Sequence, residues 1–243
     1  MNKKYLLIDS KYRDINDSLS TSTNFRYTLP QTVTMKEYIK LKLLYLPRVN
    51  YLITKNNCTF KIILTDTGTV INFFLPYGNY SPLELVTRIN TQYSDNGFVT
   101  TYNTRSYEIA FLSSVAFKLD LTVGYFYRLL SLKPMIYDSS WAGNVFATFS
   151  SIINFNSPNY INLNINNITN TSIMGNKNNI QFGFIVPINS TNFGEIIKLD
   201  KEYVKIKISE TKVNYLDIVL TDDYNEPFDN NNFDFYFVIE YLC

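Results

Sequence analysis

The sequence predicts an all-β protein built on a single jelly-roll β-sandwich, with a small α+β unit inserted into it. Aromatic residues make up 16% of the 243 residues, mostly as 20 Tyr and 18 Phe, and aromatic side chains suit a pleated, half-buried surface. Apolar and polar residues alternate with a period of two in about eight segments, without regular helices between them. About eight such strands close most commonly as a jelly roll.

We predict that residues 1–35 form an N-terminal arm. It contains a short apolar stretch at 5–8, a polar stretch at 18–24, and an alternating piece at 25–29 that Pro30 closes. A terminal segment of this kind becomes ordered when it is tied down by another element.

The jelly-roll domain is predicted to be discontinuous and to cover 36–66 and 136–243. Its first strand is indicated at 39–45, where apolar residues recur at every second position, and Pro47 ends that strand. The same alternation predicts further strands at 161–165, 180–186, 204–208, 216–220 and 233–241.

The inserted α+β domain is predicted to cover 67–135, in the order β-β-α-β-β-β-α. Strands are expected just before it, at 58–64, and within it, at 70–75, 98–102, 107–112 and 117–121, and a second, short helix is expected at 125–132. The segments 58–64 and 70–75 are expected to form one hairpin, and the segments 98–102 and 107–112 a second one.

The first helix of the insertion has a complete start signal. Ser81 is the expected N-cap, Pro82 takes the first helical position, and Glu84 completes a capping box. Tyr80 and Leu85 are spaced to form a hydrophobic staple. The segment 95–97, Asp-Asn-Gly, is expected to end the helix.

The absence of histidine excludes several kinds of chemistry. Ser-His-Asp and Cys-His triads and His-ligated zinc are ruled out, because histidine is the usual general base near neutral pH and the commonest metal ligand. The net charge of +1 gives no overall basic excess for binding phosphate. We expect Cys58 and Cys243 to be reduced, and no apolar stretch reaches the length of a membrane span.

Carboxylates are the remaining candidates for catalysis or metal binding. A pair of them could support glycoside hydrolysis, and the candidates are Asp120, Glu195, Asp217, Asp222, Asp223 and Glu226. The candidate ligands of a calcium site are Asp66, Asp120, Asp222 and Asp223, but the EF-hand spacing is absent. Solvated turns explain these residues better, so we predict no catalytic, cofactor-binding or metal-binding residues and a protein that is not an enzyme.

The N-terminal region resembles the penton and minor capsid proteins of virophages and giant double-stranded DNA viruses. The resemblance lies in "LLIDSKYRD", followed after a polar gap by "NFRYTLPQTV" and "YIKLKLLYLPRVNYLI". The positions that match the family pattern are Asp9, Ser10, Arg13, Asp14, Phe25, Leu29, Pro30 and Pro47.

The middle and the end of the chain are similar to the same family. "YGNYSPLELVTRIN" resembles its Gly-x-Tyr-Thr helix start, with Ser81 in place of Thr. The last thirty or so residues, beginning "VNYLDIVLTDD", resemble its closing hairpin and aromatic last strand, although Asn225 replaces a usual glycine.

This resemblance implies a structural penton protein. Such a protein forms homopentamers at the fivefold vertices of an icosahedral virion, after assembly in the host cytoplasm, and contacts the major double jelly-roll capsid protein. It also implies that the insertion projects outward.

Other functions stay open from the sequence alone. A carbohydrate- or receptor-binding jelly-roll spike or fibre protein is the main alternative, and exposed aromatic residues in 67–135 would favour it. A carboxylate hydrolase is a third. Contact with packaged DNA is allowed by Lys3, Lys4, Lys11 and Arg13, but nearby aspartates largely cancel their charge, so we favour a protein–protein role.

Overall fold

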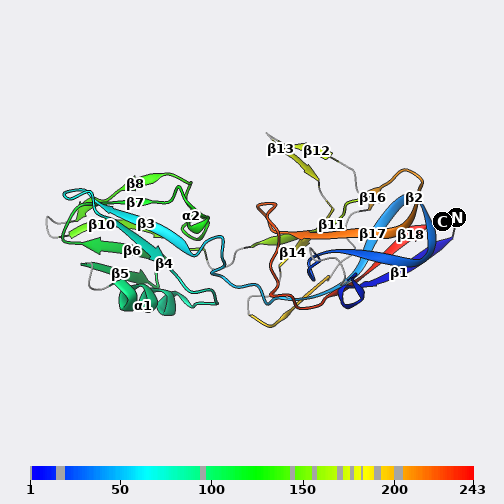
Figure 1. Cartoon of the computed structure of the whole chain (residues 1–243), viewed down its shortest axis with the longest axis horizontal. Helices are drawn as coiled ribbons and strands as arrows, with labels where there is room; N and C mark the ends of the chain where they lie inside the picture. Colours follow the sequence, from blue (N-terminus) through cyan, green and yellow to red (C-terminus); the bar gives the residue numbers. More distant parts are fainter. Residues whose placement is uncertain are drawn as a thin grey trace. The chain divides into compact units, whose positions relative to one another are not determined.

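The computed structural model describes residues 2–14, 20–93, 97–142, 146–154, 158–168, 172–175, 178–181, 183–188, 193–199 and 205–243. The chain divides into two units, which are described separately here (Figure 1). Unit 1 comprises Met1–Asn50 and Pro158–Cys243, and unit 2 comprises Tyr51–Ser157. The predicted insertion, 67–135, lies within unit 2.

Antiparallel strands make up unit 1. Its sheet order is β1-β18-β2-β17-β11-β14, and β15 and β16 pair with the edge of β2 that β18 leaves free. Their bounds are β1 (Lys3–Asp9), β2 (Asn24–Pro47), β11 (Tyr160–Ile165), β14 (Phe184–Pro187), β15 (Ile196–Lys198), β16 (Ile206–Lys207), β17 (Thr211–Thr221) and β18 (Tyr236–Leu242). A 3-10 turn, η1 (Ser10–Tyr12), follows β1, and β12 (Ser172–Gly175) pairs with β13 (Asn178–Gln181).

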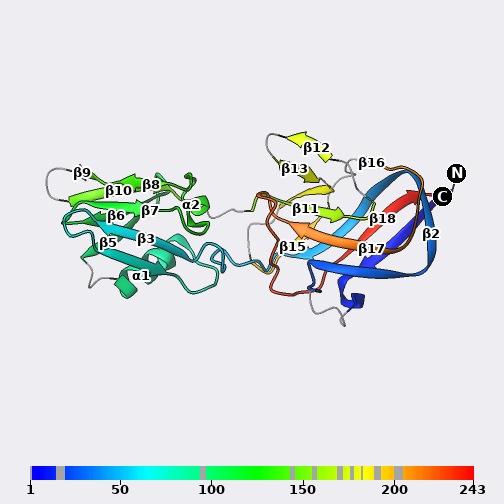
Figure 2. The ribbon, with the colours of Figure 1, turned by 45° about the horizontal axis from the view of Figure 1, so that its top comes forward.

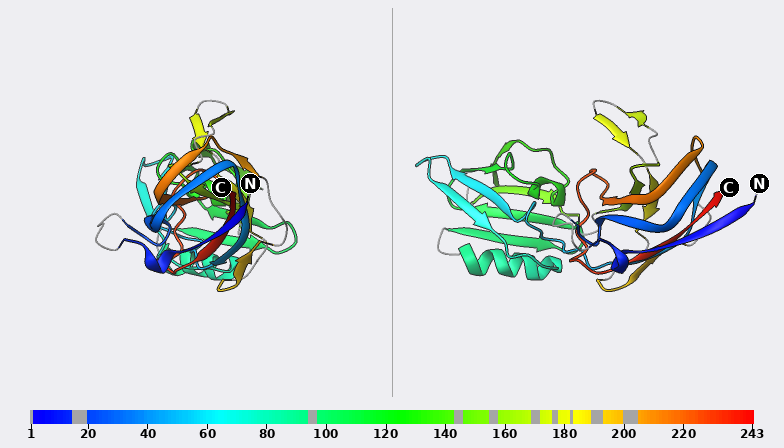
Figure 3. Two further views of the ribbon diagram at one scale, coloured as in Figure 1. Left: turned by 90° about the vertical axis from the view of Figure 1, so that its right-hand side faces the viewer. Right: turned by 45° about the vertical axis from the view of Figure 1, so that its right-hand side comes forward.

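The long strand β2 belongs to two sheets. Met35 pairs with Thr211 of β17, whereas Ile39 pairs with Tyr241 of β18. Between them the ladder shifts register and Glu37 has a positive φ of 60°, the kind of bulge at which a strand turns from one sheet into another. Figure 2 and Figure 3 show the resulting curl of β2, in blue.

We call the two halves sheet A and sheet B. Sheet A contains β1, β18, the second half of β2, β15 and β16, and sheet B contains the first half of β2, β17, β11 and β14. Alternate residues of both sheets form one core, which includes Ile8, Ile39, Leu41, Leu163, Ile165, Leu216, Ile218, Phe237 and Ile239. The predicted all-β jelly-roll sandwich is therefore confirmed.

Unit 2 has two four-stranded antiparallel sheets with the orders β4-β3-β7-β8 and β5-β6-β10-β9. Their bounds are β3 (Thr59–Leu64), β4 (Val70–Phe74), β5 (Phe98–Asn103), β6 (Glu108–Ser113), β7 (Phe117–Asp120), β8 (Ile136–Asp138), β9 (Ser140–Ala142) and β10 (Phe146–Ile152), with helices α1 (Pro82–Tyr93) and α2 (Phe126–Leu129). Phe60 lies in an aromatic core, with its ring centroid 4.5 Å from Phe73 and 4.4 Å from Phe126.

The predicted elements of the insertion are confirmed. Glu84 accepts a hydrogen bond from Ser81 N at 2.7 Å, and Ser81 Oγ accepts one from Glu84 N at 3.3 Å, so the capping box forms. The strands occur where they were expected, and the second helix is one turn long instead of the predicted 125–132. The predicted helix end falls partly on 94–96, outside the described residues.

The N-terminal 35 residues contribute strands to the body of unit 1. The short strand expected at 5–8 lies within β1, which pairs with β18, and residues 24–35 form the first half of β2, which pairs with β17. Pro30 lies where four residues of β2, between the pairs formed by Thr28 and Val33, face a single residue of β17. A bulge tolerates proline because no ladder donor is needed there.

Two predicted strands differ from the structure in their bounds. The strand expected at 180–186 is divided between β13, which ends at Gln181, and β14, which begins at Phe184. Gly183 between them passes so close to β11 that a Cβ there would lie 1.9 Å from Leu163 O. The last strand begins at Tyr236, and Phe233, expected on its inner face, is 54% exposed. Residue 204 of another expected strand lies outside the described residues.

Candidate assembly surface

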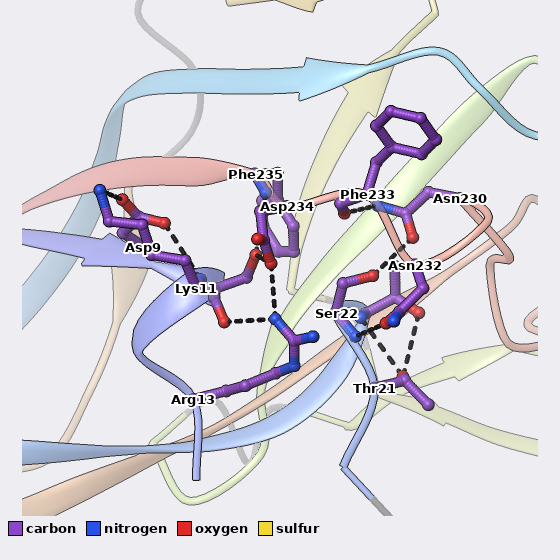
Figure 4. Close-up of polar contacts among 12 residues, drawn as sticks. Asp9, Lys11, Arg13, Thr21, Ser22, Asn230, Asn232, Phe233, Asp234 and Phe235 are labelled. Carbon is purple, nitrogen blue, oxygen red and sulfur yellow. Dashed lines mark hydrogen bonds and ion pairs between the residues drawn. The ribbon is translucent and has the colours of Figure 1, made fainter. Parts of the chain in front are cut away.

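The motif that follows β1 fastens this strand to the start of β18 (Figure 4). Ser10 Oγ donates to Asp234 Oδ1 at 2.9 Å and accepts from Phe235 N at 2.9 Å. Arg13 donates to Ser10 O at 2.9 Å and forms an ion pair with Asp234, and Asp9 accepts from Lys11 N as the cap of η1. These residues therefore fix the position of the edge strand.

A second set of contacts holds the segment before β2 against the loop before β18 (Figure 4). Ser22 Oγ donates to Asn230 Oδ1 at 2.7 Å, and Ser22 N donates to Asn232 Oδ1 at 3.1 Å. Asn230 Nδ2 in turn donates to Phe233 O at 2.6 Å. The asparagine-rich loop 229–232 thus uses its amides to join two parts of unit 1.

Strand β1 leaves one edge of sheet A unpaired within the described chain. Ser10 N donates to Phe235 O and Cys243 N donates to Asn2 O, so even-numbered residues of β1 direct their backbone groups toward β18. In an antiparallel ladder, the backbone N–H and C=O groups of successive residues point alternately to one side of the strand and to the other. The groups of the odd-numbered residues Tyr5 and Leu7 therefore point to the open edge. Both side chains are more than half exposed.

The outer face of sheet A carries a buried carboxylate. Glu240 lies in a cross-strand row with Tyr5 and Lys40, and its side chain is 4% exposed. Its oxygens accept hydrogen bonds from Tyr5 (3.2 Å) and Tyr38 (3.3 Å). Lys3 lies 3.6 Å away. This cluster links β1, β18 and β2 on their solvent side.

Opposing effects set the pKa of the Glu240 carboxyl. Burial by itself would raise the pKa, because it disfavours the charged form. The charge of Lys3 and the hydroxyl of Tyr5 act against it, and they are joined by Lys42 and Tyr38. The pKa is consequently lower than that of an ordinary glutamate, and the group is ionised at neutral pH.

The apolar part of the same face lies nearer the other end of β1. Tyr45 of β2 stacks on Tyr236 of β18 with ring centroids 4.9 Å apart and planes 7° apart. Leu7 and Leu43 are exposed beside them. An exposed patch of aromatic and aliphatic side chains with polar surroundings is typical of a protein–protein contact.

Five of the candidate carboxylates are engaged in local contacts, each with its own partner: Asp66, Asp120, Asp217, Asp222 and Asp223. Asp217 forms a bidentate pair with Arg26, at 2.8 and 3.3 Å. Asp222 Oδ1 accepts from the backbone N of Tyr224 and Glu226, at 2.9 and 2.8 Å. These contacts are those of strand surfaces and Asx turns.

The carboxylates of Asp223, Asp120 and Asp66 also accept local hydrogen bonds. Asp223 Oδ2 accepts from Asn159 N at 3.0 Å, and Asp120 Oδ1 accepts from Thr122 N at 2.9 Å. Asp66 caps its own turn through Thr67 N. In the part of the chain that the structure describes, no three Cys, Asp or Glu residues gather as a metal site would require.

Cys58 is buried and Cys243 half-buried, and neither forms a disulfide. Burial raises the pKa of the Cys58 thiol.

Across the described residues, no helix combines the length and apolar character that crossing a membrane requires.

Alternation in the sequence indicates part of this surface. Lys40, Lys42, Lys205 and Lys207 each alternate with core residues, so they had to share the outer faces of their strands. The pairing of β16 with β2, which brings these lysines to one sheet, is not encoded locally.

Comparison with known proteins gives a likeness of fold. No protein-family model matches the chain. No curated protein matches it in sequence either. Among solved structures, the crystal structure of the selenomethionine-labelled mavirus penton protein matches with a TM-score of 0.46 and 11% identity, covering 99% of each chain. That protein is a penton protein, the class that the sequence was found to resemble, and the likeness concerns the fold.

Proposed function

We propose that this chain is a structural, non-enzymatic vertex protein that forms homopentamers at the fivefold vertices of an icosahedral DNA virus. The observation that carries the proposal is the edge of β1 that pairs with no strand among the described residues, where Tyr5 and Leu7 are exposed and their backbone groups point outward. An edge of this kind is a template for pairing with another chain. Its natural role is therefore subunit contact.

A closed ring needs two different surfaces that meet head to tail. Unit 1 offers them, because β1 ends sheet A and β14 ends sheet B in the described part of the ladder. Ile185 on β14 is exposed, as Leu7 is on β1. Two unlike edges on two sheets would let each copy contact one neighbour on either side.

The remaining details of the proposal follow from the resemblance found in the sequence. The protein would lie in the virion, after assembly in the host cytoplasm, and would contact the major double jelly-roll capsid protein. The inserted domain, placed at 67–135 from sequence, would project from the capsid. The separate aromatic core of unit 2 supports an insertion that folds as a body of its own.

The test is the mass of the purified full-length chain in solution, measured by sedimentation velocity and native mass spectrometry. We expect one discrete species of five copies. Leu7→Lys should shift it to monomer, because a charge on the edge opposes strand pairing, whereas Val99→Lys, an equally exposed site in unit 2, should not. A wild-type chain that stays monomeric, with or without the major capsid protein, would refute the proposal.

A second candidate function, carbohydrate or receptor binding, is favoured by one observation in unit 2. Phe74 and Tyr77 are both about half exposed, with ring centroids 6.2 Å apart, and exposed aromatic faces are where sugar rings stack. A glycan array with the full chain tests it. Binding that is lost in Phe74→Ala/Tyr77→Ala would support this function, and absence of binding would remove it.

A further inference from the structure

The outer face of sheet A concentrates positive charge. Ile206 faces the core, so its neighbours Lys205 and Lys207 face outward, and Lys207 pairs with Tyr38 of β2. Lys205 Nζ lies 4.5 Å from the centroid of the Tyr38 ring. The same register places six lysines on this face: Lys3, Lys40, Lys42, Lys198, Lys205 and Lys207. Lys40 is buried, and Lys3 and Lys42 lie 3.6 and 4.0 Å from Glu240, so Lys198, Lys205 and Lys207 provide the accessible charge.

Few carboxylates oppose Lys198, Lys205 and Lys207 among the described residues. The face carries Glu240, whose oxygens are taken by the cluster described above, and Asp9, whose carboxylate lies 3.1 Å from Lys11 Nζ. Lys205 and Lys207 are exposed. The segment 200–204 between β15 and β16 lies outside the described residues; its sequence contains two acids and one lysine. The face is thus strongly basic although the whole chain has a net charge of only +1.

We propose that the outer face of sheet A binds the phosphate backbone of nucleic acid. Lysines on several adjacent strands form a surface of fixed positive charge, and such a surface binds a polyanion by releasing its condensed counterions. Tyr5 and Tyr38 lie among the lysines, and both hydroxyls donate to Glu240. This inference stands on the charge distribution alone and does not depend on the proposed vertex role.

The acidic loop of a second copy of the chain would be a poorer binding partner for this face than nucleic acid. Asp222 accepts from two backbone N–H groups of its turn, and Asp223 accepts from Asn159. Asp234 is paired with Arg13 and Ser10. Because these carboxylates already stabilise their own loop, a second copy would offer few uncommitted charges. A nucleic acid offers one phosphate charge on each nucleotide.

The experiment is a fluorescence-anisotropy titration of the purified full-length chain with a labelled duplex DNA of arbitrary sequence, repeated over a series of salt concentrations. We expect binding that weakens steeply with salt. If about four lysines contact phosphates, the slope of log K against log salt is about −3.6. In Lys205→Glu/Lys207→Glu the affinity should fall at least about tenfold and the slope should become shallower by about 2.

The matched control is Lys55→Glu/Lys133→Glu, which makes the same change of net charge with two exposed lysines of unit 2. It should bind DNA as the wild type does. If Lys205→Glu/Lys207→Glu fails to fold, as judged by circular dichroism, Lys198→Glu/Lys207→Glu replaces it.

Three results would overturn the inference. The first is a wild-type chain that does not bind DNA at low salt. The second is an equal loss of affinity in the unit 2 control, which would show only an effect of net charge. The third is binding to vesicles containing phosphatidylserine but not to DNA, or a change in oligomer size without DNA binding, which would assign the face to lipid or to protein instead.

Discussion

Glu240 is the residue whose ionisation most directly stabilises the edge of sheet A. Its folded-state pKa lies below the ordinary value of 4.5, so the folded form binds the proton less readily than the unfolded form. The stabilisation is therefore complete above the ordinary pKa and is lost as the pH falls through the folded pKa.

The test of this role is Glu240→Gln, which keeps the shape and removes the charge. We expect its free energy of unfolding to be lower than wild type by about 1–3 kcal/mol at neutral pH, and the difference to shrink as the pH falls below about 4. Urea unfolding at several pH values measures it. Glu210→Gln, which removes an exposed partner of Lys36, is the control, and an equal effect in both variants would contradict the special role of Glu240.

Gly183 is a second residue with a specific physical requirement. A methyl group at this position would collide with Leu163 O, since the Cβ would lie only 1.9 Å away and the obstacle is backbone. Gly183→Ala should cost at least about 1–3 kcal/mol, as overpacking does. At Gly194 there is open space around the Cβ position, and only the positive φ of 85° opposes a side chain. Gly194→Ala should therefore cost less in the same unfolding experiment.

Neighbouring residues of strand β1 should differ in how well they tolerate proline, because their N–H groups point alternately to β18 and to the open edge. Leu7→Pro removes a donor that points to the open edge, so the ladder with β18 stays intact. Leu6→Pro removes a donor inside that ladder. We expect Leu7→Pro to melt close to the wild-type temperature but to lose self-association, and Leu6→Pro to lower the melting temperature. A Leu7→Pro variant that still forms wild-type oligomers would show that the edge is not the contact.

The elements that could be predicted are those with local signals. Helix α1 was found from the capping box of Ser81 and Glu84, and the hairpins of unit 2 were found from alternation and turn residues. The full length of β2 was not found, because Pro30 and the polar residues after it indicate a break when the bulge opposite β17 is unknown. The same holds for Phe233, whose loop is shaped by contacts with Ser22 and Asn230.

The candidate surface depends on pairings between distant segments, and this limited what the sequence could show. Glu240 meets Tyr5 and Tyr38 across more than 200 residues of chain. Lys205 reaches the same sheet only because β16 pairs with β2. The motif of Asp9, Ser10 and Arg13 was recognised from the sequence, but its contacts with Asp234 and Phe235 became visible only in the structure.

For the whole molecule, the relevant feature is that each unit has its own hydrophobic core. The core of unit 1 draws on both ends of the chain, from Ile8 to Tyr241, and that of unit 2 lies between Leu52 and Ile153. Bodies with separate cores can unfold separately unless a large apolar interface joins them. The two units should then respond independently to mutations in their interiors.

Phe60→Ala in unit 2 and Leu163→Ala in unit 1 test this independence, since both side chains are fully buried. Each should cost about 2–5 kcal/mol in its own unit, because a cavity is left behind. Hydrogen exchange followed by mass spectrometry separates the effects. Phe60→Ala should speed exchange in peptides from 51–157 and leave β17 and β18 protected, and Leu163→Ala should do the reverse. Loss of protection in both units from either substitution would mean that the chain unfolds as one cooperative body, and the insertion could then not be treated as a module added to the jelly roll.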